Sequence, residues 1–109
     1  MDSRLPAHVD VSALVRQVNA AGGFAAVIRK GERDAGTILL QLVENGRNAR
    51  VYERMPQLDG SRKWTLIKSE AIDSKQQIDE YLNRRSHQDP DLWIVELDIP
   101  DGERFIPES

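Results

Sequence analysis

The chain has 109 residues, of which 39% are hydrophobic and 30% are charged, so its length allows one domain with a modest core. Fifteen basic and eighteen acidic side chains leave a net charge of -3, which argues against binding of duplex nucleic acid by charge alone. The absence of cysteine excludes disulfides, thiolate metal sites and thiol nucleophiles. We expect a single domain over residues 1–109, with its core between about 5 and 99 and a short tail over 100–109.

The first predicted element is an amphipathic helix over residues 10–21. Its apolar stripe has helical spacing and consists of Val11, Leu14, Val15 and Val18. Asp10 is the predicted N-cap, and Gly22-Gly23 ends the helix because glycine adopts left-handed geometry readily.

An apolar run over 24–28 follows the helix. Such a run, Phe24-Ala25-Ala26-Val27-Ile28, predicts a strand covered on both faces near the middle of a sheet. A polar turn over 31–36 then leads into a second strand over 37–43, which is rich in aliphatic and β-branched residues.

Asn45-Gly46 predicts a two-residue hairpin turn between the second and third strands. In that register Leu42 faces Ala49 and Leu40 faces Val51 on an apolar face. The other face then carries the candidate binding residues Arg50, Tyr52, Arg54, Gln41 and Thr37.

Three further elements complete the chain. Asp59-Gly60 predicts a second reversal into a strand over 63–68; a two-residue loop, which we favour, places Met55 opposite Trp64, and a three-residue loop moves Trp64 away. Ser74-Lys75-Gln76-Gln77 has the form of a capping box and predicts a second helix that ends at Asp89-Pro90. The last strand runs over 92–99, with Trp93, Val95, Leu97 and Ile99 on one side.

The element order α-β-β-β-β-α-β predicts an α+β fold. Two consecutive reversals make a mostly antiparallel sheet, and we expect a two-layer sandwich with both helices on one face. This pattern leaves open whether the last strand pairs with the first strand or lies at the edge.

Four segments of the chain resemble a known family. They are Ala20-Ala21-Gly22-Gly23-Phe24-Ala25-Ala26-Val27-Ile28-Arg29-Lys30-Gly31, Ala35-Gly36-Thr37-Ile38-Leu39-Leu40, Asp59-Gly60 with Trp64, and Asp89-Pro90-Asp91-Leu92-Trp93-Ile94-Val95-Glu96. In this order they resemble the small bacterial proteins of domain-of-unknown-function family 1491, over about Leu5 to Asp98. The resemblance implies a single-domain cytoplasmic protein and brings no activity with it.

No motif assigns a catalytic residue, a metal or a cofactor. His87 with Asp89 and Asp91 could form a metal or acid–base site, but these residues also fit a helix end and turn, which is the interpretation we favour. The loop over 31–36 could cradle an anion, but it lacks the phosphate-binding glycine patterns and carries Glu32 and Asp34.

The favoured function is a small non-enzymatic protein-interaction module with an unknown protein partner. The alternative is a single-stranded nucleic-acid binder that uses Arg50, Tyr52 and Arg54, which the net charge disfavours. Charge is uneven, because residues 1–69 carry 11 basic against 7 acidic side chains and residues 70–109 carry 4 against 11. A homodimer is compatible with either class.

No apolar run approaches the roughly 20 residues that span a bilayer, so we expect no membrane segment and a cytoplasmic location.

Overall fold

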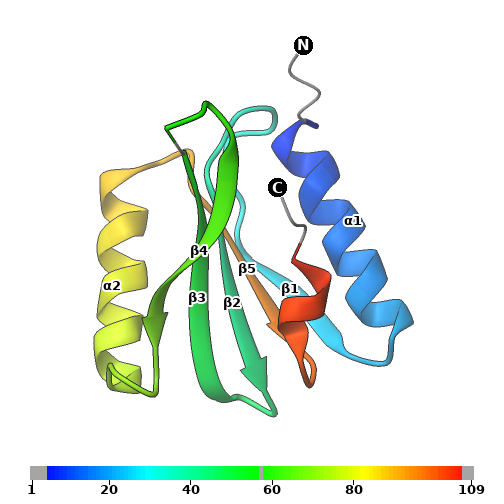
Figure 1. The fold of residues 1–109 in the computed structure, drawn as a ribbon, viewed down its shortest axis with the longest axis vertical. Coiled ribbons are helices and arrows are strands. Elements are labelled where there is room, and N and C mark those ends of the chain that lie inside the picture. Colours follow the sequence, from blue (N-terminus) through cyan, green and yellow to red (C-terminus); the bar gives the residue numbers. More distant parts are fainter. Residues whose placement is uncertain (1–4, 57, 107–109) are drawn as a thin grey trace.

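The computed structural model describes residues 5–56 and 58–106. The described residues form two α-helices, five strands and a short 3-10 helix, which Figure 1 shows in chain order from blue to red. Their bounds are α1 Ala7–Ala20, β1 Phe24–Arg29, β2 Ile38–Glu44, β3 Arg47–Pro56, β4 Arg62–Ser69, α2 Lys75–Gln88, β5 Trp93–Asp98 and η1 Gly102–Phe105. The predicted order of helices and strands is confirmed.

The strands form one sheet in the order β1-β5-β2-β3-β4. β5 is parallel to β2, and the other three neighbouring pairs are antiparallel. The fold is therefore α+β with a mostly antiparallel sheet, as predicted. The last strand lies inside the sheet and pairs with both β1 and β2, which answers the question that the sequence left open.

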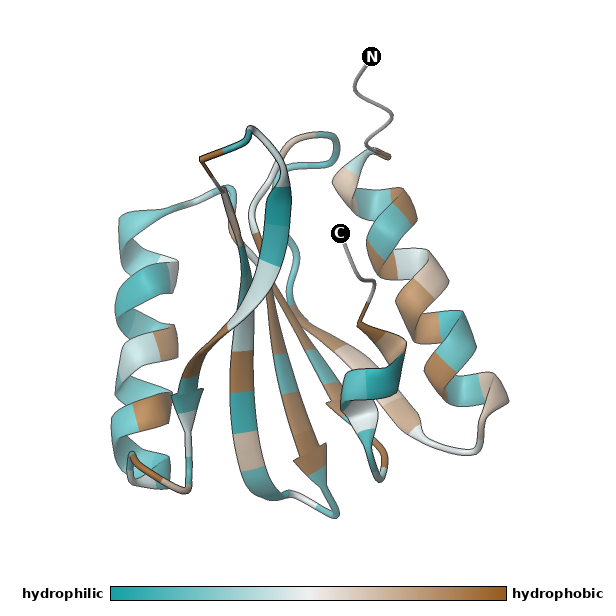
Figure 2. Ribbon diagram, in the orientation of Figure 1, coloured by the Kyte–Doolittle hydropathy of each residue, from teal (hydrophilic) through white to brown (hydrophobic). Residues whose placement is uncertain are grey.

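The two helices lie on opposite faces of the sheet, so the prediction of a two-layer sandwich with both helices on one face is wrong (Figure 1). Alternate residues of β2 belong to separate cores: Leu40 packs on the α1 side, whereas Leu39 packs with Ile78 of α2. Figure 2 shows hydrophobic residues concentrated in the central strands and a mostly hydrophilic α2. β2 has apolar side chains on both faces of the sheet, so a helix is needed on each face to exclude water.

β1 is an edge strand, and the prediction that it lies near the middle is wrong. Three of its apolar side chains are exposed: Phe24 (66%), Val27 (44%) and Ile28 (58%). The register between β1 and β5 shifts between Val27 and Arg29, which marks a bulge. β5 suits a place inside the sheet because four of its six residues are apolar and buried, and it lies beside β2, of which every residue but the last is buried.

α1 begins at Ala7, three residues before the predicted N-cap Asp10. The backbone amides of Ala7 and His8 donate to the carbonyl oxygens of Asp34 and Arg33, at 3.0 and 2.9 Å. The loop over 31–36 therefore satisfies the free amides at the start of the helix, and no side-chain cap is needed. Gly22, with φ +92°, follows the helix end as predicted.

A bulge follows the Asn45-Gly46 turn and changes the predicted register. Glu44 pairs with Arg47 as a two-residue turn requires, but Leu42 pairs with Arg50 instead of Ala49. The extra residue is in β3, where Asn48 adopts a positive φ of 56°. A shift of one residue moves every β3 side chain to the other face, so the predicted cross-strand pairs are wrong beyond the turn.

The second reversal also differs from its prediction. Arg54 pairs with Trp64 and Met55 with Lys63, so Met55 does not face Trp64. Pairing ends at Pro56 and Arg62, so residues 58–61 belong to a loop; Gln57 lies outside the described residues. Proline has no amide proton to continue the ladder, which explains a loop longer than two residues.

The capping box of α2 is confirmed. The Ser74 side chain accepts from the amide of Gln77 at 3.1 Å, and the Gln77 side chain accepts from the amide of Ser74 at 2.8 Å. Arg85 joins the last turn of the helix to β3 through Glu53, at 2.7 Å. No helix in the described part of the chain is both long and apolar enough to cross a membrane.

Candidate functional site

The five candidate binding residues do not share one face of the sheet. Arg50, Tyr52 and Arg54 lie on the α1 side, because the bulge at Asn48 changes the parity of β3. Gln41 lies on the α2 side, in register with Glu96 of β5. Thr37 precedes β2, and its carbonyl oxygen accepts from the Trp93 amide at 2.8 Å. The structure therefore brings three of the five together and places Gln41 elsewhere.

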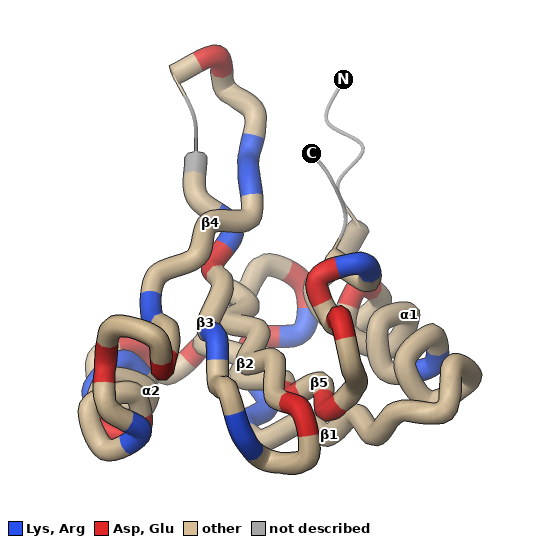
Figure 3. Tube along the Cα trace, turned by 60° about the horizontal axis from the view of Figure 1, so that its bottom comes forward, with Lys and Arg blue, Asp and Glu red and all other residues tan. Residues whose placement is uncertain are grey.

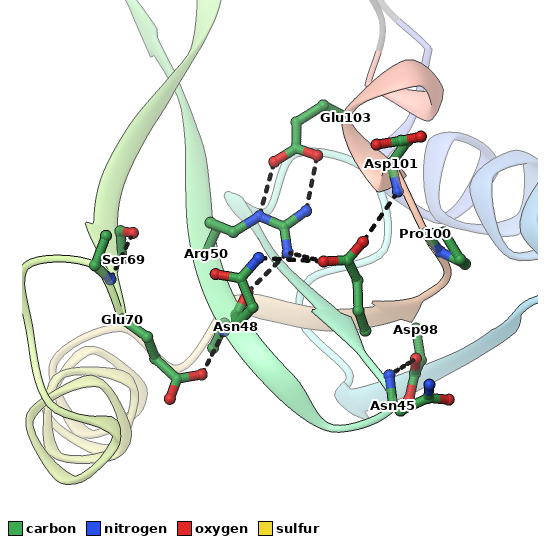
Figure 4. A network of polar contacts seen from close by, with 12 residues as sticks. Asn45, Asn48, Arg50, Ser69, Glu70, Asp98, Pro100, Asp101 and Glu103 are labelled. Carbon is green, nitrogen blue, oxygen red and sulfur yellow. Dashed lines mark hydrogen bonds and ion pairs between the residues drawn. The ribbon is translucent and has the colours of Figure 1, made fainter.

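Arg50 joins β3 to η1 through Glu103 (Figure 4). Its Nε and Nη2 atoms donate to the two carboxylate oxygens of Glu103 at 2.8 and 2.7 Å, and Nη1 donates to the Asn48 carbonyl at 2.7 Å. The hydroxyl of Tyr52 donates to the same carboxylate at 3.1 Å. The Arg50 side chain is only 11% exposed. This cluster fastens the C-terminal segment to the sheet.

The protonation of this cluster follows from its contacts. The hydrogen bonds from Arg50 lower the pKa of Glu103 below its ordinary value, and they raise the pKa of Arg50 in return. Burial, followed by the hydrogen bond to Glu103, raises the pKa of Tyr52. Figure 3 shows acidic positions gathered near the ends of β2 and β5 and on η1, close to basic positions of β3. These shifts keep Arg50 and Glu103 charged and Tyr52 protonated near neutral pH.

Arg54, the third candidate on this face, also has partners within the chain. Its Nη2 atom lies 3.7 Å from a carboxylate oxygen of Asp10, and its guanidinium carbon lies 5.5 Å from the centre of the Trp64 ring. A stacking base or an acidic partner would have to compete with these contacts.

The two other motifs singled out in the sequence have structural roles. In the loop over 31–36, the amides of Asp34 and Ala35 donate to the Glu32 carboxylate at 2.8 and 2.5 Å, so this loop supplies its own anion. After α2, the Asp89 side chain accepts from the Asp91 amide at 2.9 Å. The His87 ring nitrogen contacts the Asn83 carbonyl at 2.8 Å. Over residues 5–56 and 58–106, no group of three or more histidine, aspartate or glutamate residues could hold a metal ion.

A groove of about 700 Å³ lies between α2 and the β1–β5–β2 part of the sheet. One wall is a stripe of α2, and the other is formed by residues of β1, β5 and β2. The lining residues are Ile28, Arg29, Gln41, Lys75, Asp79, Leu82, Asn83, Ser86, Ile94 and Glu96. Of the sequence candidates, only Gln41 belongs to it. The available signal was a polar residue inside the apolar run from Ile38 to Val43.

Two residues that line this groove each have a buried side-chain atom without a hydrogen-bond partner. These atoms are Oε1 of Gln41 and Nε of Arg29, and they are the only such side-chain atoms within the described ranges. Gln41 is 6% exposed, and its Nε2 atom donates to Glu96 at 2.9 Å. A terminal nitrogen of Arg29 donates to the Asp89 and Pro90 carbonyls at 3.4 and 3.2 Å. Unsatisfied buried polar groups cost stability, and these two residues line one groove, which makes the groove the candidate site.

The rim of the groove is apolar at β1. Ile28 lines it, and Phe24 and Val27 are exposed on the same strand. The free edge of β1 is poorly suited to pairing with another strand, because it is bulged and because the Ala25 amide donates to the Asn19 side chain at 3.1 Å. The groove, and not the strand edge, is the surface that this region offers to a ligand.

The fold and groove together define a small α+β protein with a groove on one side of its sheet. The family model "Protein of unknown function (DUF1491)" matches residues 5–107, and this chain belongs to that family. A search of curated proteins gives no match.

Solved structures of related proteins have the same fold. A crystal structure of a DUF1491 family protein from Caulobacter crescentus CB15 is 34% identical, covers 96% of this chain and 97% of that chain, and has a TM-score of 0.84. An NMR structure of a DUF1491 family protein from the same organism is 33% identical, covers 95% and 94%, and has a TM-score of 0.82. Protein Atu0922 from A. tumefaciens is 33% identical over 90% and 88%, with a TM-score of 0.74. The family and these structures assign no specific function.

Proposed function

We propose that this protein is a small non-enzymatic protein-interaction module whose partner docks in the groove between α2 and β1. The observation that supports this proposal is that Gln41 Oε1 and Arg29 Nε, both buried and without partners, belong to residues that line the same groove. A docked chain would supply the missing donor and acceptor. It would also cover Ile28, which lines the groove and is 58% exposed.

The proposed location is the cytoplasm of a bacterium, because the related proteins of known structure come from bacteria. Cell fractionation tests the compartment. A second copy of the chain is one candidate partner, and light scattering on the purified protein tests for a dimer.

The nucleic-acid alternative depends on Arg50, Tyr52 and Arg54. Each of these side chains already has a partner within the chain, so binding of single-stranded nucleic acid would require those contacts to break. Titration of mixed oligonucleotides at low and high salt tests this alternative, which predicts binding that weakens steeply with salt.

Site-directed photo-cross-linking in cells tests the docking site. A photoreactive residue at Ile28, on the groove rim, is compared with one at Leu66, which is 46% exposed on β4 at the other edge of the sheet. We expect a defined protein to be captured at position 28 and not at 66. Capture at neither position, or equally at both, contradicts the proposal.

The captured partner is then purified and its affinity measured against two variants of α2. Asn83→Trp fills the groove, whereas Glu80→Trp places the same side chain on an exposed position that does not line it. We expect N83W to weaken binding at least about tenfold and E80W to leave it unchanged. Equal binding by both variants would show that the partner docks elsewhere.

A further inference from the structure

The groove has an acceptor pair at the contact between β2 and β5. Gln41 and Glu96 face each other across parallel strands, and the Gln41 amide nitrogen donates to the Glu96 carboxylate at 2.9 Å. A carboxylate only accepts hydrogen bonds, so it fixes the orientation of the Gln41 amide. The amide oxygen is therefore turned away from Glu96 and is left without a donor.

The cations of the groove are engaged with other groups. Lys75 pairs with Asp79 at 2.7 Å, and Arg29 donates to the Asp89 and Pro90 carbonyls. Glu96 is half-buried, and the contact that the described structure gives its side chain is the neutral Gln41 amide. A partly desolvated carboxylate beside an unsatisfied amide oxygen attracts a cation with several N–H donors.

We infer that the groove recognises a basic side chain, and arginine in particular, within an extended segment of the partner. The inference rests on the proposed function. A guanidinium group carries five donors in a fixed plane, so it can pair with the Glu96 carboxylate and donate to Gln41 Oε1 together. A hard metal ion is a poorer match, because it needs about six oxygen ligands and the described residues offer no such group.

The same residue of the partner can satisfy Arg29. Arg29 pairs with Ile94, two positions along β5 from Glu96, so their backbones are roughly 7 Å apart along the strand. A backbone carbonyl of the partner accepts from Arg29 Nε while its side chain reaches Glu96. The apolar walls at Ile28, Leu82 and Ile94 then cover the aliphatic part of that side chain.

The length of the groove fits an extended segment. Its α2 wall runs from Lys75 to Ser86, which is about 16 Å of helix. About five residues of extended chain span that distance. The groove thus accepts a short peptide with one basic residue near its centre.

Binding of defined peptides to the whole protein, followed by NMR chemical shifts, tests the inference. The probes are acetyl-Ala-Arg-Ala-amide and the same peptide with citrulline, which has the shape of arginine without its charge. We expect the arginine peptide to bind at least about tenfold more tightly and to shift the amide signals of Gln41 and Glu96. Equal binding of both peptides, or shifts confined to the Arg50 face, overturns the inference.

Two groove variants and one control provide an independent test. Glu96→Gln removes the charge, and Gln41→Leu removes the unpaired oxygen. Glu80→Gln makes the same charge change at an exposed position of α2 that does not line the groove. We expect E96Q to weaken binding of the arginine peptide at least about tenfold, Q41L several-fold and E80Q not at all. Unchanged binding in both groove variants overturns the inference.

The partner captured by cross-linking distinguishes the two proposals. If N83W weakens that partner and E96Q does not, the inference is overturned and the proposed function stands. If no partner is captured at Ile28 but the arginine peptide binds with the expected pattern, the inference about the groove stands and the proposed function is overturned.

Discussion

Arg50 and Glu103 form a bidentate ion pair that fastens the C-terminal η1 to β3 of the sheet, with donor–acceptor distances of 2.8 and 2.7 Å. Arg50 is largely buried, whereas the Glu103 side chain is 42% exposed. Removal of the Glu103 carboxylate leaves the buried guanidinium of Arg50 without this acceptor.

Glu103→Ala should lower the free energy of unfolding by about 1–2 kcal/mol, a range reduced for the exposure of Glu103. Urea denaturation measures the change, with Glu80→Ala as the control. An E103A protein as stable as E80A would show that the pair contributes nothing to folding.

The same pair predicts a dependence of stability on pH. The pKa of Glu103 is lower in the folded protein than its ordinary value of 4.5. The folded state therefore binds this proton less readily, and the stabilisation is fully present above pH 4.5 and is lost as pH falls through the folded pKa. The stability difference between wild type and Glu103→Gln should shrink as pH falls from 6 toward 3. A difference that is constant over this range contradicts the assignment.

Gly31 is in contact with the turn before β5. A Cβ atom at this position would lie 2.1 Å from the Asp91 carbonyl oxygen, which is a backbone atom that cannot turn aside. Gly31→Ala should cost about 3 kcal/mol, at the upper end of overpacking costs. Gly46 has φ +76° and open space around it, so Gly46→Ala should cost about 1 kcal/mol. Thermal unfolding compares them, and equal losses would contradict the predicted close contact.

Asn48 occupies the left-handed position of the bulge, with φ 56°. Asn48→Gly should leave stability nearly unchanged, because glycine adopts this conformation freely. Asn48→Val should cost about 2 kcal/mol, because a β-branched residue is strained there. Chemical denaturation measures both variants. If N48V matched N48G, the bulge would have to lie at another residue.

We predict that the Gln41–Glu96 pair lowers the free energy of unfolding relative to apolar residues at the same two positions. The double variant Gln41→Leu with Glu96→Val removes the unpaired oxygen together with the carboxylate, so we expect it to be about 1 kcal/mol more stable than wild type. Gln41→Leu alone should gain less, because Glu96 then loses its donor. Equilibrium denaturation provides the values, and a double variant less stable than wild type would indicate that the pair serves the fold.

Elements whose stability depends on near neighbours in the chain were predictable. The stripe of α1 from Val11 to Val18, the capping box at Ser74 and the Asn45-Gly46 turn all depend on residues a few positions apart. The burial of Trp93, Val95, Leu97 and Ile99 on one side of the last strand was predictable for the same reason.

The candidate site was predictable only in part. Alternation of side chains along two regular strands predicts that Gln41 and Arg50 share one face. In the structure a bulge at Asn48, which has a positive φ, places them on opposite faces. Neighbouring residues do not specify that bulge, whereas the packing of Ala49 and Val51 under α2 does.

The sequence by itself determined the kind and order of the elements, the mostly antiparallel sheet and the membership of a family. The tertiary structure decided that β5 lies between β1 and β2, that the helices cover opposite faces, and that Gln41 meets Glu96 in a groove. Periodicity reports which residues avoid water but not which partner covers them. Which element covers each face depends on burying both faces of β2 and β5 together. This packing brings Gln41 and Glu96, which are 55 positions apart, into contact.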